Sequence, residues 1–173
     1  MTVLRTDRLL LRPLEQGDAE DYAAMRYHPD VSKWLLAADR PPAEAARASI
    51  ERFAQSWRER RYAPWGLFLE ERLIGHGGLN FVPEFGETEV LWALHPDEWG
   101  KGFATEMARA ALNFGFGAIG LELIFAITRP DNLASQAVMK RLGMTYRKSV
   151  RYRGMEAVWF DVANARGTAD TSR

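Results

Sequence analysis

The segment from Glu89 to Glu106 constrains the fold of this chain more than any other. It reads EVLWALHPDEWGKGFATE: an apolar strand pattern over Glu89–Leu94, a turn that contains Gly100 and Gly102, and the start of a helix. Glycine lets the backbone approach a ligand closely, and the first turn of a helix leaves unpaired N–H groups at the positive end of its dipole. This order predicts a phosphate or pyrophosphate site, although an isolated Gly-x-Gly also occurs in ordinary tight turns.

Other common phosphate motifs and several classes of function are excluded. No Gly-Lys-Ser/Thr follows the glycines, and no third glycine completes a dinucleotide fingerprint. The chain has no cysteine, and its three histidines lack metal-ligand spacing, so we expect no metal site. Lys and Arg number 23, as do Asp and Glu, which argues against binding to nucleic acid or anionic membranes. Charged residues interrupt the apolar N-terminus, so we expect neither a signal peptide nor a membrane span there. We therefore expect a cytoplasmic protein.

Hydrophobic periodicity predicts an α/β sandwich around a mixed sheet. An apolar stripe at three- and four-residue spacing predicts a long helix that starts at Pro42, and the Gly75–Gly78 region predicts a bulge or a close backbone neighbour. We expect one domain over residues 1–165 and a flexible C-terminal tail over residues 166–173. The expected strands are Val3–Pro13, Trp65–Glu70, Arg72–Phe81, Glu89–Leu94, Leu123–Thr128 and Ala157–Ala163; the other expected helices are Asp18–Met25, Ala104–Phe116 and Asn132–Leu142.

Two blocks resemble the GNAT superfamily of N-acetyltransferases. The run from Trp99 to Ala104, WGKGFA, is similar to that family's (Gln/Arg)-x-x-Gly-x-(Gly/Ala) pyrophosphate loop, with Trp99 where many members have Gln or Arg. The run Pro130–Met144, PDNLASQAVMKRLGM, resembles its second cofactor segment. The N-terminal Leu4–Pro13 and the strand Glu89–Leu94 resemble the RimJ/RimL-like branch. The resemblance covers residues 3 to 163.

The resemblance implies a mostly antiparallel mixed sheet with helices on both faces and a V-shaped split between two central strands. It implies acetyl-CoA as co-substrate and no metal. The main chain of Trp92, Ala93 and Leu94 would pair with the pantetheine amides, and Asn132 would contact the pantetheine arm near the thioester. Beside Trp99, main-chain N–H groups would hold the pyrophosphate, and the Lys101 side chain would add charge from the rim. The residues that would supply these N–H groups are Gly100, Lys101, Gly102, Phe103, Ala104 and Thr105. Plainer interpretations are that Trp92 is core, Thr105 an ordinary helix residue and Asn132 a helix cap.

Direct transfer of an acetyl group to an amine needs a proton acceptor and a proton donor. Glu89, at the start of the cofactor strand, is the favoured general base, with Glu87 on the same face and Glu156 as alternatives; a solvated strand end is the plainer interpretation of the first two. By resemblance to RimL-like enzymes, Ser135 supplies the proton for the leaving thiolate; a simple helix cap is the plainer interpretation. Met139 stands where many family members have a tyrosine, which favours the serine. A main-chain N–H of Glu89–Leu94 would meet the oxyanion.

Three functions follow. The first is acetylation of a protein N-terminal α-amine, which predicts an open groove. The second is acetylation of a small amine such as a polyamine, an amino acid or an antibiotic, which predicts a closed, acid-lined pocket. The third, of another class, is a non-catalytic acyl-CoA-binding regulatory module. The acceptor would enter past the N-terminal half, where the turn His28–Trp34 is a candidate lining, and a homodimer through sheet edges is expected.

Overall fold

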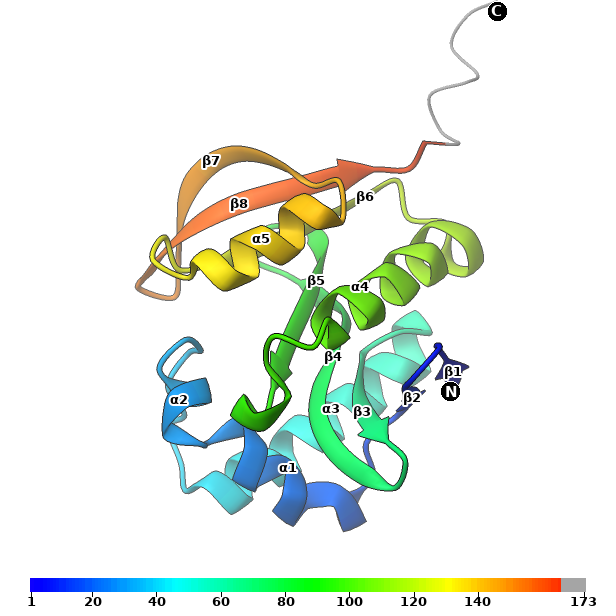
Figure 1. Cartoon of the computed structure of the whole chain (residues 1–173), viewed down its shortest axis with the longest axis vertical. Helices are drawn as coiled ribbons and strands as arrows, with labels where there is room; N and C mark the ends of the chain where they lie inside the picture. Colours follow the sequence, from blue (N-terminus) through cyan, green and yellow to red (C-terminus); the bar gives the residue numbers. More distant parts are fainter. Residues whose placement is uncertain (166–173) are drawn as a thin grey trace, which may run out of the picture.

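The computed structural model describes residues 1–165; the predicted tail 166–173 lies outside the described residues. An eight-stranded sheet has the order β1-β2-β3-β4-β5-β6-β8-β7, and every neighbouring pair is antiparallel except β5 and β6 (Figure 1). The strands are β1 (Leu4–Arg5), β2 (Leu10–Arg12), β3 (Pro64–Leu69), β4 (Arg72–Val82), β5 (Glu87–Leu94), β6 (Leu123–Thr128), β7 (Thr145–Tyr152) and β8 (Met155–Ala163). The helices are α1 (Ala19–Arg26), α2 (Pro29–Ser32), α3 (Pro42–Arg60), α4 (Phe103–Phe114) and α5 (Leu133–Arg141).

The helices cover both faces of the sheet, as expected. Successive residues of a strand point to opposite faces. On β4, the His76 ring contacts Tyr22 of α1 and Phe53 of α3, whereas a Cβ at the next residue, Gly77, would meet Met107 of α4. Helices α1 and α3 therefore cover one face and α4 the other. No helix within residues 1–165 is long and apolar enough to cross a membrane.

The expected single strand Val3–Pro13 is wrong, because the chain turns back after Arg5 and forms a two-stranded pair. Thr6 Oγ1 lies 2.6 Å from Glu106 Oε1, and the Arg8 backbone N–H donates to the same oxygen at 2.9 Å. The Glu106 carboxylate of α4 thus holds the turn. A partner one hundred residues away in the chain cannot be read from the local pattern.

Two elements are absent from the sequence-based expectation. Strand β7 is an edge strand whose first five residues are all exposed, so it lacks the apolar alternation that marks a half-buried strand. The expected turn over His28–Trp34 contains the one-turn helix α2, where the His28 imidazole Nδ1 accepts the Asp30 N–H. The remaining strands and helices lie close to their expected ranges.

The glycine-rich part of β4 has a close backbone neighbour and lies next to a bulge. The β3–β4 register shifts between Leu67 and Phe68, leaving Ile74 as an extra residue in β4. A Cβ at Gly75 would collide with the Ala93 carbonyl of β5. The missing side chain therefore lets β4 and β5 approach closely.

Strand β5 separates from β6 near its beginning. Along their length the two strands pair only at Glu89 and Phe125. Beyond that pair, no strand within residues 1–165 pairs with the carboxyl-terminal half of β5 on this side. This is the V-shaped split expected between two central strands, and its exposed main-chain groups are available to a ligand.

Candidate active site

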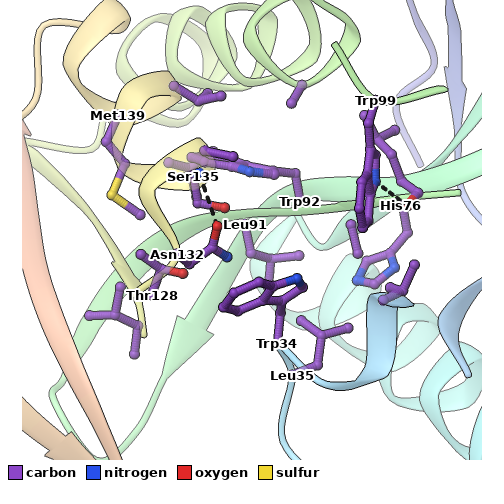
Figure 2. Close-up of a pocket in the computed structure, with 18 of the residues that line it drawn as sticks. Trp34, Leu35, His76, Leu91, Trp92, Trp99, Thr128, Asn132, Ser135 and Met139 are labelled. Carbon is purple, nitrogen blue, oxygen red and sulfur yellow. Dashed lines mark hydrogen bonds between the residues drawn. The ribbon is translucent and has the colours of Figure 1, made fainter. Parts of the chain in front are cut away.

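A cavity of about 600 Å³ fills the split between β5 and β6 (Figure 2). Strand β5 forms its floor, the N-terminal turns of α4 and α5 form one side, and α1, α2 and the segment after α2 form the other. Every residue expected to bind the cofactor lines this cavity except Lys101. The lining members are Trp92, Ala93, Leu94, Trp99, Gly100, Gly102, Phe103, Ala104, Thr105, Asn132 and Ser135.

The loop before α4 has the geometry that an anion site needs. Gly100 has φ 73° and Gly102 has φ 83°, left-handed conformations that favour glycine. Gly102 caps α4 without a side-chain hydrogen bond, so the first N–H groups of the helix keep no capping partner. A Cβ at Gly100 would meet nothing within 4 Å, so the space beside the loop is open. The loop and the helix dipole together suit a phosphate.

Lys101, which was expected to add charge at the rim, does not line the cavity. Lys101 Nζ lies 3.0 Å from Glu98 Oε2, and Arg72 lies 2.6 Å from the other oxygen of the same buried carboxylate. These two hydrogen bonds hold the pKa of Glu98 below its ordinary range. Arg141, at the end of α5, lines the cavity instead and donates from Nη1 to Thr105 Oγ1 at 3.3 Å. The sequence pattern did not indicate Arg141, whose only local signal was its place in the second cofactor block.

Trp99 stands at the mouth of the cavity and is 44% exposed. Its indole Nε1–H donates to the Leu94 carbonyl at 2.9 Å (Figure 2). This bond uses one of the two lone pairs of that carbonyl and fixes the ring over the end of β5. The other main-chain groups of β5 that line the cavity, at Trp92 and Ala93, have no such side-chain partner among residues 1–165.

The start of α5 places an amide and a hydroxyl in the cavity. The Asn132 side-chain oxygen accepts the Ser135 N–H at 3.2 Å, so Asn132 caps the helix, as its plainer interpretation requires (Figure 2). Both residues also line the cavity, and capping orients Asn132 without excluding a ligand contact. Met139, one turn further along, is buried and lines the same wall.

Glu89, the favoured general base, lines the cavity. It is 8% exposed, and Asn80 Nδ2 on β4 donates to its Oε1 at 2.9 Å. Burial raises its pKa to about 7, although the Asn80 bond acts in the opposite direction. Glu87 and Glu156 do not line the cavity, and Glu156 is exposed beside Arg151 at 3.4 Å. Of the three candidate bases, Glu89 alone reaches the site within the described part of the chain.

The acceptor side includes residues that sequence reasoning singled out and others that it missed. Trp34, in the expected lining turn, projects into the cavity with Leu35 beside it (Figure 2). The missed residues are Arg26, His76, Asn80 and Tyr152. They lie on three different elements, α1, β4 and β7, and no local motif joins them. For Asn80 alone a signal existed, because the short turn between β4 and β5 sets it opposite Glu89.

A model of the acetyltransferase (GNAT) domain matches residues 8–145. The chain is 31% identical over 144 residues to YoaA of Bacillus subtilis, described as an uncharacterized N-acetyltransferase, covering 82% of this chain and 81% of YoaA. The crystal structure of an acetyltransferase from Agrobacterium tumefaciens superposes with a TM-score of 0.82 at 26% identity, covering 94% of each chain.

The branch expected from the sequence also appears among the structural neighbours. RimL, described as a ribosomal L7/L12 α-N-protein acetyltransferase in complex with coenzyme A, has a TM-score of 0.78 at 17% identity. The superposition covers 94% of this chain and 98% of RimL. At 17% identity, this likeness concerns the fold alone. The domain match and the kinship with YoaA show that this acyltransferase belongs to the GNAT family of N-acetyltransferases.

Proposed function

We propose that this protein transfers an acetyl group from acetyl-CoA directly to a primary amine. The observation that carries the proposal is the convergence of three features on one cavity. These are the open edge of β5, the glycine-bearing N-terminus of α4 and the buried carboxylate of Glu89. A split strand, an anion site and a base are what a thioester-dependent amine acetylation requires.

The residues of the cavity fit acetyl-CoA. The N–H groups from Gly100 to Thr105 would hold the pyrophosphate, with the Arg141 guanidinium beside them. The main chain of Trp92 to Leu94 would pair with the pantetheine arm, and the Asn132 amide would contact it near the thioester. When bound, acetyl-CoA supplies the thioester carbonyl that the amine attacks.

Glu89 accepts the proton that the amine must lose, directly or through one water. A base whose pKa lies near the working pH balances its ionised fraction against its strength, and Glu89 has a pKa of about 7. The Asn80 hydrogen bond fixes the orientation of the carboxylate. Ionised Glu89 is thus a positioned base at neutral pH.

Ser135 and the main chain of β5 complete the site. The Ser135 hydroxyl donates a proton toward the departing sulfur, and the Asn132 cap holds the residue at the first turn of α5. A main-chain N–H of Glu89–Leu94 on the open edge of β5 donates to the oxyanion.

The acceptor enters past α2. The fold likeness to RimL supports a protein N-terminal α-amine, whereas the side chains that narrow this entrance, Trp34 and Leu35, support a small amine. The carboxylates that line the cavity are Glu89 and Glu98 among residues 1–165, and Glu98 is committed to two cations. A polycationic acceptor would find little free negative charge here, which weighs against polyamines and aminoglycosides.

Calorimetry with acetyl-CoA tests the cofactor site, comparing the wild type with Gly102→Trp. Gly120→Trp is the matched control, since Gly120 has a similar φ of 80° with nothing within 4 Å and does not line the cavity. We expect binding to be lost in Gly102→Trp and kept in Gly120→Trp. Undiminished binding by Gly102→Trp would put the cofactor elsewhere, and a wild type that does not bind acetyl-CoA would overturn the proposal.

A turnover assay separates the enzyme from a non-catalytic acyl-CoA-binding module. Release of free CoA thiol is followed with a panel of amines, for the wild type, Glu89→Gln and Ser135→Ala. Turnover that both substitutions diminish supports the proposed roles. Tight acetyl-CoA binding without turnover on any amine favours the regulatory module.

A cytoplasmic homodimer remains a prediction. The exposed edge β7 offers the ladder groups that such pairing needs, and its cations Arg147 and Arg151 form ion pairs with Asp161 and Glu156. Light scattering after size exclusion that gives a monomer mass would remove the dimer.

A further inference from the structure

Arg26 lines the cavity, and one nitrogen of its guanidinium is unsatisfied. Arg26 ends α1, and its Nη2 donates to the Leu36 carbonyl at 3.1 Å. Its Nη1 is buried and has no hydrogen-bond partner, and no carboxylate among residues 1–165 lies within ion-pair distance of it. A buried N–H group without a hydrogen-bond partner is costly, so this donor indicates a place for an anion.

A second unpaired polar atom lies on the same side of the cavity. His76 of β4 is 6% exposed and lines the cavity, and its buried Nδ1 has no hydrogen-bond partner in the described range 1–165. Burial, and then the charge of Arg26, lower the pKa of His76 to about 3. The imidazole is therefore neutral and carries one N–H, which can donate to an anion without adding charge. Tyr22, one turn before Arg26, packs edge-on against this ring at 5.3 Å.

The surrounding wall is apolar and offers no substitute anion. It consists of Val31, Trp34, Leu35 and Leu36; Figure 2 shows Trp34 and Leu35. The two carboxylates of the cavity are used elsewhere, because Glu98 pairs with Arg72 and Lys101 and Glu89 accepts from Asn80. Low polarity strengthens an ionic hydrogen bond, so a ligand carboxylate that reached Arg26 would be held firmly.

We propose that Arg26 and His76 form a carboxylate-binding subsite for the acceptor, whose class is a small primary amine that carries a carboxylate. This inference rests on the proposed acetyl transfer. The spacing along β4 sets the length of the acceptor. His76 and Asn80 are four residues apart on one face of β4, which is about 13 Å at about 3.3 Å per residue. Asn80 is the hydrogen-bond partner of Glu89. With Glu89 acting directly or through one water, an acceptor that uses both ends separates its amine and carboxylate by several bonds, as an ω-amino acid does.

Matched acceptors test the subsite. The first is 5-aminopentanoate, and the second is its neutral primary amide of nearly the same shape. We expect the wild type to favour the carboxylate, and Arg26→Met to raise its KM about 10- to 100-fold, the equivalent of about 1.5–3 kcal/mol for a hydrogen bond to a charged group. The KM of the amide and of acetyl-CoA should change less than twofold. Arg47→Met, which removes an exposed charge of α3 outside the cavity, should change nothing.

A binding measurement separates failure of the subsite from failure of acetyl transfer. Calorimetry of 5-aminopentanoate with the CoA-saturated protein needs no turnover, and we expect binding in the wild type and its loss in Arg26→Met. His76→Phe keeps an aromatic ring and removes the N–H, and it is the second variant should Arg26→Met not fold. It should weaken the binding of 5-aminopentanoate and leave the binding of the amide unchanged. Equal use of the two acceptors by the wild type, or an equal effect of Arg26→Met on both, would overturn the subsite. A wild type that does not bind acetyl-CoA would overturn the proposed function instead.

Discussion

Replacing Glu89 with Gln should slow the reaction and, at alkaline pH, stabilise the protein. Gln has nearly the same shape and can still accept the Asn80 hydrogen bond, but it cannot take a proton from the amine. Loss of a positioned general base typically costs about 10²- to 10⁴-fold in rate. We therefore expect kcat/KM of the wild type to rise with pH through about 7, the pKa of Glu89, and that rise to be absent in Glu89→Gln.

The stability effect follows from the same burial. Folding raises the pKa of Glu89 from an ordinary 4.5 to about 7, so the folded protein binds more protons than the unfolded chain between these values. The stability of the wild type must therefore fall as pH rises through this window. At about 1.36 kcal/mol per unit the total loss is about 3 kcal/mol, most of it between pH 5 and pH 8. Glu89→Gln escapes this loss, and its pH-independent packing cost cancels in the difference between the two pH values.

Urea denaturation at pH 5 and pH 8, with initial rates at several pH values, measures both effects. The free energy of unfolding of Glu89→Gln relative to the wild type should become more favourable by about 2 kcal/mol between the two pH values. Glu87→Gln is the matched control, two residues earlier on the same face of β5 and outside the cavity, and should change neither quantity. A Glu89→Gln rate within threefold of the wild type would refute the role of the base, and a pH-independent stability difference would refute the burial argument.

Three further changes test the scaffold. Asn132→Ala should lower the free energy of unfolding by about 1 kcal/mol, since it removes the cap of α5, and Asn132→Ser should retain most of that stability in the same denaturation assay. Gly75→Ala should lower the melting temperature, at a cost of about 1–3 kcal/mol, because its Cβ would push the Ala93 carbonyl of β5 away, whereas Gly17→Ala, which meets nothing within 4 Å, should be neutral. Arg72→Met should destabilise the protein by about 1 kcal/mol at neutral pH. Because the pKa of Glu98 is held low by this partner and Lys101, that difference should shrink as pH falls through the folded-state pKa, and urea midpoints that differ equally in acid would contradict the pairing.

Local chemistry made much of the scaffold predictable. The long helix α3 was visible as an apolar stripe, and the β3–β4 hairpin as two apolar runs around a charged turn. Gly100 and Gly102 marked the loop before α4, and Asn132 marked the cap of α5. In each case the residues that interact lie within a few positions of one another, so the pattern in the sequence and the contact in space coincide.

Patterns failed where a distant partner decides the conformation. The N-terminal run reads as one strand, but Glu106 of α4 holds Thr6 and Arg8 in a turn. Strand β7 has no buried stripe of its own and is ordered by its ladder with β8. Lys101 is the cation within the loop sequence, but it forms an ion pair with Glu98 and does not line the cavity. Arg141 of α5 lines the cavity instead.

The sequence by itself determined the family, the anion loop and the identity of Glu89 as a candidate base. The tertiary structure alone decided how acidic that base is, because burial at the start of the split and the Asn80 amide of the neighbouring strand set its pKa. It also brought Arg26 of α1 and His76 of β4 to one side of the cavity, fifty residues apart in the chain. The physical reason is that pKa values and unpaired charges depend on desolvation and on neighbours in space, which only the packing of the elements fixes.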